Sequence, residues 1–426
     1  MTTATALDEG RDLLRLTTAG SVDDGKSTLI GRILADAGAL TADQIATLAA
    51  QAVREGREQI DLARITDGLT AEREQGITID VAYRYFATPR RSFILADVPG
   101  HEQYTRNMVT GASKATAALL LVDARQGMTA QTRRHICIAA LLGIRDVVFA
   151  VNKMDLVDWS QDAFVRMRGA IEGFTARLGF RSRHVVPVSA RSGDNVVNAS
   201  EAMPWYRGAP LLGLLEALPP SAVAAAGPFR MSVQMASRPQ GASTHDFRGC
   251  MGRIAQGTLR VGERIVVAPG GRESTVQGIL TPRGPAASAS AGQSVTVTLA
   301  DDIDAGRGFM LASAEHPPRT GREVTAALCW LDAAPQDPRA PYLVRVGARE
   351  VAARIALPDA RLDIDTLERA PGGKPLAAND IGEARIRLQD DIAYDAYAAC
   401  KATGAFIVID SRTNATVAAG MIEHGL

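Results

Sequence analysis

The chain has 426 residues, more than one hydrophobic core usually organises, and this length predicts two or three domains. A content of 46% hydrophobic and 22% charged residues is typical of a folded globular protein and argues against a disordered chain. Because 47 basic residues balance 47 acidic ones, the overall charge does not favour nucleic acid, and we expect no nucleic-acid partner.

Residues 1–16 contain an acidic pair and no continuous apolar stretch, so the sequence predicts neither a signal peptide nor a membrane anchor. The four cysteines lie far apart and form no C-x-x-C pair, which favours reduced thiols over a zinc site or disulfides. We therefore expect a cytoplasmic protein without membrane contact.

The first half of the chain alternates short apolar runs with helix-length segments. The apolar runs lie at residues 13–18, 93–96, 118–122, 147–151 and 185–188. Continuous apolar strands are typical of a parallel sheet that is covered on both faces, so we predict an α/β domain over residues 1–222. Ligands of such sheets bind at the carboxyl ends of the strands, and the loops that follow these runs are therefore candidate sites.

The pattern changes after a stretch with few large side chains at residues 221–227, which we interpret as a linker. Beyond it, short β-branched runs punctuated by glycine lie at residues 253–257, 264–267 and 294–298. A second break at 316–322 precedes another strand-rich region that ends at 406–410. These patterns predict two β-barrel domains, over residues 228–317 and 322–426.

The first motif follows the apolar run at 13–18 and precedes a helix predicted from Thr28 to Ala37. Its sequence GSVDDGKS fits the phosphate-loop pattern G-x-x-x-x-G-K-[ST]. The glycines let backbone N–H groups point at phosphate oxygens, and the helix start adds partial positive charge. Lys26 can neutralise the β- and γ-phosphates, while the Ser27 hydroxyl can bind Mg²⁺. The motif predicts a triphosphate site formed by Gly20, Ser21, Val22, Asp23, Asp24, Gly25, Lys26, Ser27 and Thr28.

A second motif, DVPGH, follows the run at 93–96 and comprises Asp97, Val98, Pro99, Gly100 and His101. Asp97 is placed at a strand end to hold Mg²⁺ through water, and the Gly100 N–H can approach a γ-phosphate because glycine has no side chain. A D-x-x-G sequence by itself is an ordinary turn. Its position behind a phosphate loop is what favours a nucleotide site.

Two further loops predict which base is bound. They contain Asn152, Lys153, Met154, Asp155, Ser189 and Ala190. The Asp155 carboxylate can accept hydrogen bonds from the guanine N1–H and 2-amino group, neither of which adenine offers. A backbone N–H of Ser189-Ala190 suits the guanine O6 atom, and Asn152 can tie its loop to the phosphate loop. A site that hydrogen-bonds one base leaves buried polar groups unpaired with the other, so the sequence predicts GTP. The N-terminal domain is thus predicted to be a P-loop GTPase domain.

The segment before the DVPGH motif contains GITI at residues 76–79, which resembles the first switch of translation-factor GTPases. The resemblance implies that Thr78 binds Mg²⁺ and senses the γ-phosphate, alongside the metal residues Ser27 and Asp97. It also implies that His101 orients the attacking water and acts in catalysis together with Lys26. The alternative makes His101 a turn histidine that is hydrogen-bonded to the backbone.

Several longer segments resemble the GTPase subunit of bacterial sulfate adenylyltransferase. They read VDDGKSTLIGR, DGLTAEREQGITIDVAYRYF, PGHEQYTRNMVTGAS, NKMDLVD, MPWYRGAPLL at 203–212 and DFRG at 246–249. The resemblance spans nearly the whole chain. Two features depart from that family: Val98 stands where we expect threonine, and the stretch 238–245 is longer.

The resemblance implies a heterodimer with a catalytic, adenylyl-transferring subunit that makes adenylylsulfate and pyrophosphate from ATP and sulfate. GTP hydrolysis in this chain would drive that reaction, with GTP and Mg²⁺ as its cofactors. Two alternatives stay open at this point. One is an elongation factor that delivers tRNA, and the other is a GTP-dependent scaffold without catalysis.

Overall fold

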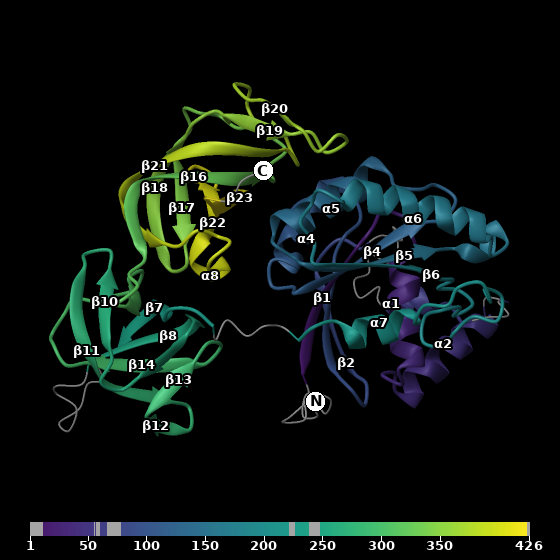
Figure 1. The fold of residues 1–426 in the computed structure, drawn as a ribbon, viewed down its shortest axis with the longest axis horizontal. Helices are drawn as coiled ribbons and strands as arrows, with labels where there is room; N and C mark the ends of the chain where they lie inside the picture. Colours follow the sequence, from purple (N-terminus) through teal and green to yellow (C-terminus); the bar gives the residue numbers. More distant parts are fainter. Residues whose placement is uncertain are drawn as a thin grey trace. The chain divides into compact units, whose positions relative to one another are not determined.

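A computed structural model describes residues 12–54, 56, 60–65, 78–220, 226–237 and 248–423. The chain divides into two compact units, Met1–Ser221 with Ile364–Leu367, and Ala222–Asp363 with Glu368–Leu426 (Figure 1). Three features of the sequence lie outside the described residues: most of the switch segment at 66–77, the linker residues 221–225 and the stretch 238–247.

The first unit is built on a sheet with the strand order β2-β3-β1-β4-β5-β6. Its parallel strands are β1 (Leu13–Ala19), β3 (Ser92–Asp97), β4 (Ala117–Asp123), β5 (Asp146–Asn152) and β6 (Ser182–Pro187). All residues of β4 and β5 are buried, as their continuous apolar runs predict. The predicted parallel sheet is therefore confirmed.

One edge of this sheet differs from the prediction. Strand β2 (Ala82–Ala87) pairs with β3 in the antiparallel direction, and the sequence pattern does not reveal it. Tyr83 and Tyr85 are exposed on this edge strand, so it lacks the continuous apolar run that marks the buried strands.

Helices cover both faces of the sheet (Figure 1). On one face lie α1 (Lys26–Asp36) and α7 (Leu211–Ala217), whose apolar side chains share a core cluster with the strands. The other face carries α4 (Thr105–Ala112), α5 (Ala130–Leu141) and α6 (Gln161–Thr175). A further helix, α2 (Ala42–Arg54), follows α1 in the chain. Short 3-10 helices are η1 (Leu62–Ile65), η2 (Glu102–Tyr104) and η3 (Met154–Val157).

The second unit contains two closed rings of strands. The first ring runs β10-β15-β7-β8-β14-β11 and closes because β10 also pairs with β11. Its strands are β7 (Arg230–Ser237), β8 (Gly249–Gln256), β10 (Arg264–Ala268), β11 (Arg272–Thr281), β14 (Ser294–Leu299) and β15 (Met310–Ser313). Short strands β9 (Thr258–Arg260), β12 (Gly284–Ala286) and β13 (Ser288–Ser290) decorate it.

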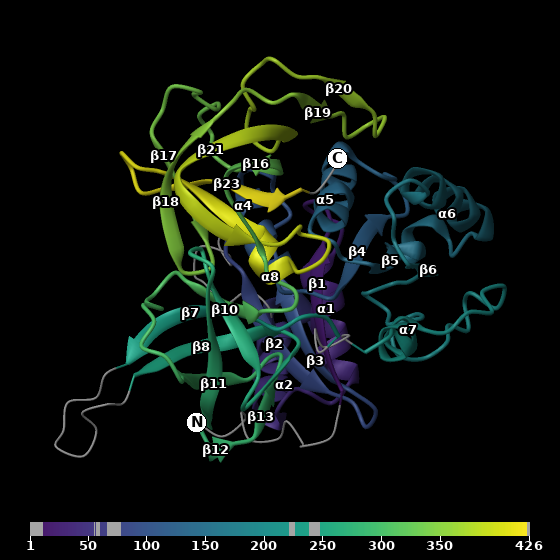
Figure 2. The same cartoon turned by 60° about the vertical axis from the view of Figure 1, so that its left-hand side comes forward.

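The second ring runs β16-β23-β22-β17-β18-β21 and closes through pairing of β16 with β21. Its strands are β16 (Arg319–Trp330), β17 (Tyr342–Val346), β18 (Arg349–Ile355), β21 (Ile381–Tyr394), β22 (Ala405–Asp410) and β23 (Thr416–Ile422). It also carries β19 (Ala360–Leu362), β20 (Arg369–Pro371) and the short helix α8 (Lys401–Gly404). Figure 2 shows both rings from a second side. An α/β domain followed by two β-barrels is thus confirmed.

A buried ion pair joins the two barrels. Arg230 on β7 is 3% exposed, and its Nε lies 2.8 Å from Asp395 Oδ2, just after β21. The Thr403 hydroxyl donates to the same carboxylate at 2.7 Å, and Arg230 also donates to the carbonyl of His316 at 2.8 Å.

No helix in the described ranges combines the length and apolarity of a membrane span.

Candidate nucleotide site

The phosphate loop curls between the end of β1 and the start of α1. Asp23 and Gly25 have φ values of 67° and 89°, and this pair of left-handed residues turns the chain back on itself. A Cβ added to Gly25 would lie 2.5 Å from Asn152 Nδ2, and one added to Gly20 would lie 3.1 Å from Asp24 Oδ2. Gly25 is therefore required by its backbone conformation and by close packing, whereas the space around Gly20 is only tight.

The start of α1 is suited to an anion. Gly25 is the N-cap, and among the described residues no side chain caps the helix or adds acidic charge to its first turn. The first N–H groups of a helix have no partner within the helix and carry partial positive charge. Backbone geometry therefore favours an anion at the Lys26 end of α1, and phosphate binding there remains a prediction.

Lys26 is buried, and its ammonium group lies inside the loop. Nζ donates to the carbonyl oxygens of Gly20 at 2.9 Å and Ser21 at 3.0 Å. Burial lowers the pKa of Lys26, while the nearby carboxylates of Asp97 and Asp24 act in the opposite direction. A side chain at Gly100 would collide with this ammonium group, so glycine is needed there.

Asp24 turns its carboxylate into the loop. Oδ2 accepts a hydrogen bond from the Ser21 N–H at 2.6 Å. Burial raises the pKa of Asp24 to about 6, although the Ser21 N–H and Lys26 act against that rise. The sequence motif predicts a loop position for Asp24 but not this inward carboxylate.

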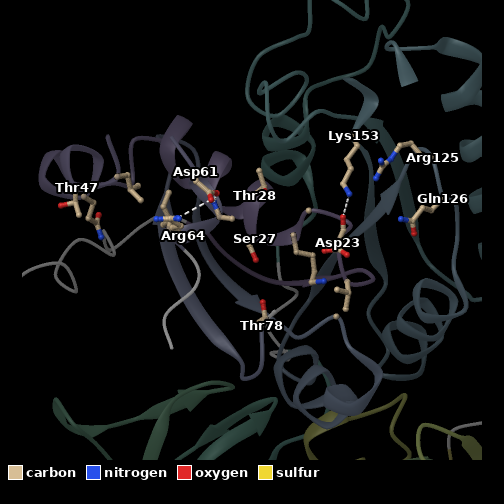
Figure 3. A pocket seen from close by; sticks show the side chains of 18 of the residues that line it. Asp23, Ser27, Thr28, Thr47, Asp61, Arg64, Thr78, Arg125, Gln126 and Lys153 are labelled. Atoms are coloured by element: carbon tan, nitrogen blue, oxygen red, sulfur yellow. Dashed lines mark hydrogen bonds and ion pairs between the residues drawn. The ribbon is translucent and has the colours of Figure 1, made fainter. Parts of the chain in front are cut away.

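Two of the three residues predicted to bind metal line the same cavity, and the third ends a neighbouring strand. Ser27 and Thr78 line a cavity of about 1220 Å³, and Figure 3 shows both hydroxyls directed into it. Asp97 ends β3, is 1% exposed and accepts a bond from the Thr18 hydroxyl at 3.2 Å. Hydroxyl and carboxylate oxygens are the donors that Mg²⁺ prefers, so these residues fit that ion. Their metal-binding role remains a prediction.

Three other residues of the DVPGH motif, Val98, Pro99 and His101, do not line the cavity. Val98 and Pro99 are buried, and neither is among the residues that line the cavity. His101 caps η2: its Nδ1 accepts the backbone N–H of Gln103 at 3.3 Å. This is the turn contact of the alternative interpretation, and His101 is not among the residues that line the cavity. A catalytic role for His101 therefore remains a prediction.

Asn152 joins the base loops to the phosphate loop. Its Nδ2 donates to the Asp24 carbonyl at 2.7 Å, and its Oδ1 accepts the Ala190 N–H at 2.9 Å. We predicted that Ser189-Ala190 offers a backbone N–H to guanine O6; in this structure the Ala190 N–H bonds to Asn152 and the Ser189 N–H to the Asp194 carbonyl. Asp155 Oδ1 accepts the Ser189 hydroxyl at 2.8 Å, which orients the carboxylate.

Lys153 makes contacts that its motif does not predict. Nζ lies 3.0 Å from Asp123 Oδ2 at the end of β4 and also contacts the Asp23 carbonyl (Figure 3). Burial acts to raise the pKa of Asp123, but bonds from Arg125 and Lys153 outweigh it and lower the pKa to about 2. Asp123 ends an apolar run, so the sequence places it at the same edge of the sheet as Lys153, which it contacts. Met154 is fully buried, so its side chain belongs to the core.

The base loops line a second cavity of about 630 Å³. Gly25, Thr28 and Lys153 border both cavities, so the two adjoin at the phosphate loop. A volume of this order is typical of small-ligand sites. The structure thus brings the predicted phosphate and base residues together around one continuous region.

The comparisons with known proteins agree with this arrangement. The elongation factor Tu GTP binding domain family matches residues 11–220, and the GTP-eEF1A C-terminal domain-like family matches residues 323–423. Sulfate adenylyltransferase subunit 1 of Chromobacterium violaceum is 49% identical over 417 residues, which cover 97% of this chain and 86% of that protein. The bifunctional enzyme NodQ of Rhizobium tropici is 48% identical over 97% of this chain.

The chain spans 65% of the length of that NodQ protein, which is less than two thirds. Among solved structures, a bacterial selenocysteine-specific elongation factor, EF-Sec, aligns over 98% of this chain and 58% of its own. Its sequence identity is 22% and its TM-score is 0.46, a likeness too weak to carry an argument.

Proposed function

The chain belongs to the sulfate adenylyltransferase subunit 1 family, and we propose that it binds and hydrolyses GTP as the regulatory subunit of such an enzyme. The observation that carries the proposal is the Asn152 bridge, which ties the predicted guanine loops to the predicted phosphate loop. A catalytic partner subunit forms adenylylsulfate and pyrophosphate from ATP and sulfate. GTP hydrolysis in this chain drives that uphill reaction.

The triphosphate is held by charge and by backbone donors. Lys26 supplies a full positive charge, and the uncapped start of α1 supplies N–H groups. Because Gly100 has no side chain, the backbone of the DVPGH motif can approach the γ-phosphate. These groups stabilise the negative charge that shifts during phosphoryl transfer, which is the main catalytic contribution in this reaction class.

Ser27, Thr78 and Asp97 would hold Mg²⁺, which neutralises phosphate charge when bound. Hydrolysis then depends on positioning one water molecule, the role we propose for His101. His101 Nδ1 accepts the Gln103 N–H, so Nε2 is the ring nitrogen that would orient that water.

Base selection is assigned to Asp155. Its carboxylate is oriented by the Ser189 hydroxyl and accepts both guanine donors, whereas adenine leaves it unpaired in a desolvated site. Sites built in this way reject the wrong ligand by ~10⁴-fold.

Coupling requires the partner subunit to bind the GTP-bound and GDP-bound states of this chain with different free energies. Thr78 and Gly100 are the proposed sensors, since they are the groups directed to the γ-phosphate and its metal. We propose a cytoplasmic complex, where ATP and GTP are both supplied. Similarity over 97% of the chain to a sulfate adenylyltransferase subunit favours this function over tRNA delivery.

Reconstitution tests the proposal. The chain is combined with the catalytic subunit, and adenylylsulfate and phosphate release are measured with GTP, GDP or no guanine nucleotide. We expect GTP alone to stimulate adenylylsulfate formation, and the catalytic subunit to stimulate GTP hydrolysis. Absence of both effects would remove the sulfate assignment. Single-turnover hydrolysis by the complex distinguishes an active GTPase from a scaffold, which would bind GTP and leave it intact.

A further inference from the structure

We propose that Asp194 is a positioning residue for guanine recognition, because it joins the loop that carries Asp155 to the loop that carries Ala190. The inference rests on the proposed GTP-binding function. It adds a residue that lies in none of the predicted nucleotide motifs. It also gives a role to the MPWYRGAPLL segment at 203–212, which the nucleotide contacts leave unexplained.

The Asp194 carboxylate collects donors from three segments. Oδ2 accepts the Trp159 indole N–H at 3.2 Å and the Ser192 hydroxyl at 2.5 Å. Oδ1 accepts the Ser200 hydroxyl at 2.6 Å. Trp159 lies four residues after Asp155, and Ser192 lies two residues after Ala190. One carboxylate therefore spans both base loops.

The carboxylate stays ionised at neutral pH. Burial acts to raise the pKa of Asp194, but hydrogen bonds from Ser192, Ser200 and Trp159 outweigh it and lower the pKa. Hydrogen bonds to an ionised acceptor are shorter and stronger than neutral ones.

The backbone transmits the position of Asp194 to the base site. The Ser189 N–H donates to the Asp194 carbonyl at 3.2 Å, and the Gly193 N–H donates to the Ser189 carbonyl at 2.8 Å. Gly193 has a φ of 89°, which permits this tight turn. Because the Ser189 hydroxyl orients Asp155, a displaced Asp194 shifts the carboxylate that selects the base.

Trp159 is held from its other side as well. Its carbonyl oxygen accepts the Trp205 indole N–H at 3.0 Å. Trp205 packs against Phe164, with ring centroids 5.5 Å apart. Asp158 and Trp159 have φ values of 52° and 49°, conformations that non-glycine residues rarely adopt. Contacts on both sides of Trp159 keep this strained turn, and with it the Asp155 loop, in place.

A selectivity ratio separates positioning from general stability. Inosine diphosphate lacks the 2-amino group that Asp155 recognises and is otherwise identical to GDP. The ratio of the two dissociation constants therefore reports the alignment of Asp155, whereas loosening of the phosphate contacts weakens both ligands equally.

Asp146 provides a matched control. It is 5% exposed at the opposite end of β5, and its carboxylate accepts Arg181 Nε at 3.1 Å and the Ser182 hydroxyl at 2.7 Å. Asp146→Ala thus removes a comparable hydrogen-bonded carboxylate far along the strand from Asp155. It should lower the unfolding temperature without changing the ratio.

The experiment measures GDP, IDP and ADP binding by calorimetry for the wild-type chain, Asp194→Ala and Asp146→Ala. We expect Asp194→Ala to reduce the preference for GDP over IDP by roughly 10-fold, the effect of losing about one hydrogen bond to a charged group. Trp159→Phe keeps an aromatic ring but removes the indole N–H that donates to Asp194. It should reduce the preference for GDP over IDP by ~3-fold. If Asp194→Ala does not fold, Trp159→Phe decides the question.

The outcomes are distinct. A wild-type chain that binds GDP no better than ADP would overturn the proposed function and this inference together. A selective wild-type chain with unchanged GDP-to-IDP ratios in the folded Asp194 and Trp159 variants would overturn the inference alone. An equal loss of ratio in Asp146→Ala would also overturn it, because the effect would then be one of general stability.

Discussion

The side chain of Asn152 donates to the backbone carbonyl of Asp24 over 2.7 Å, in a buried bond between residues that are 128 positions apart. The same amide accepts the Ala190 N–H at 2.9 Å. Three loops that follow three different strands are therefore connected by one side chain. The predicted phosphate loop and the two predicted base loops are therefore linked at this point.

Replacing Asn152 with alanine should weaken both halves of the site. The Asp24 carbonyl and the Ala190 N–H lose their buried partner, which costs about 1–3 kcal/mol, or roughly 5- to 150-fold in GDP affinity. Calorimetric titration measures the loss. Asn198→Ala, at an exposed position nearby, is the control and should bind like the wild type. Equal GDP affinities in both variants would contradict the linkage.

Asp155→Asn should change which base is preferred. An amide in this position donates a hydrogen bond where guanine also donates, but it pairs with the 2-oxo group of xanthine. We expect GTP binding to fall by ~10³-fold or more and xanthosine triphosphate to become the better ligand. Competition binding measures the exchange, and Asp158→Asn, an exposed neighbour, should keep the wild-type preference. Unchanged selectivity in Asp155→Asn would refute the base contact.

Asp24 should make the nucleotide-free protein less stable as pH rises. Burial raises its pKa from 3.8 to about 6, so the folded state binds more protons than the unfolded state between these values. Stability is therefore lost as pH rises from 4 to 6, by about 3 kcal/mol for a shift of roughly two pKa units. His135, whose pKa burial lowers to about 3, has the opposite slope in this range.

Asp24→Asn isolates this effect because His135 contributes equally to both proteins. Urea unfolding at a series of pH values should show the variant gaining stability relative to the wild type between pH 4 and 7. Asparagine keeps the shape and can still accept the Ser21 N–H, so steric change is small. Parallel stability curves for the two proteins would contradict the assignment of the burial effect to Asp24.

Arg230→Ala should destabilise the second unit. The variant leaves the Asp395 carboxylate, which is only 14% exposed, without its cation, a change that costs up to about 3–5 kcal/mol. Arg264→Ala is the control. Its ion pair with Glu273 is exposed, with 73% and 45% of the two side chains accessible. Losing this pair should lower the free energy of unfolding by less than about 1 kcal/mol. Denaturant unfolding measures both. Similar losses in the two variants would show that the Arg230 pair has no special role.

The nucleotide loops were predictable because each motif is short and follows a buried strand. The apolar runs give the strand ends, and their loops carry Lys26, Asp97 and Asn152 to the same edge of the sheet. Glycine positions are equally informative. Gly25 and Gly100 are required where a Cβ would meet Asn152 or Lys26.

Other features depend on contacts that local patterns do not encode. Asp194 receives its donor from Trp159 across 35 positions, and nothing in either local sequence marks the pair. Strand β2 is stabilised by pairing with β3 rather than by its own apolar content. Its exposed Tyr83 and Tyr85 interrupt the apolar run by which the buried strands were predicted. The contact of His101 with the Gln103 backbone was one of two alternatives, and the sequence could not choose between them because it does not fix the rotation of the side chain.

The most direct test of the central claim is calorimetric titration of the purified wild-type chain with GDP and, separately, with ADP. The Asp155 carboxylate and the Lys26 phosphate loop together predict saturable GDP binding and ADP binding weaker by ~10³-fold or more. Equal affinity for the two nucleotides, or no binding of GDP, would contradict the account.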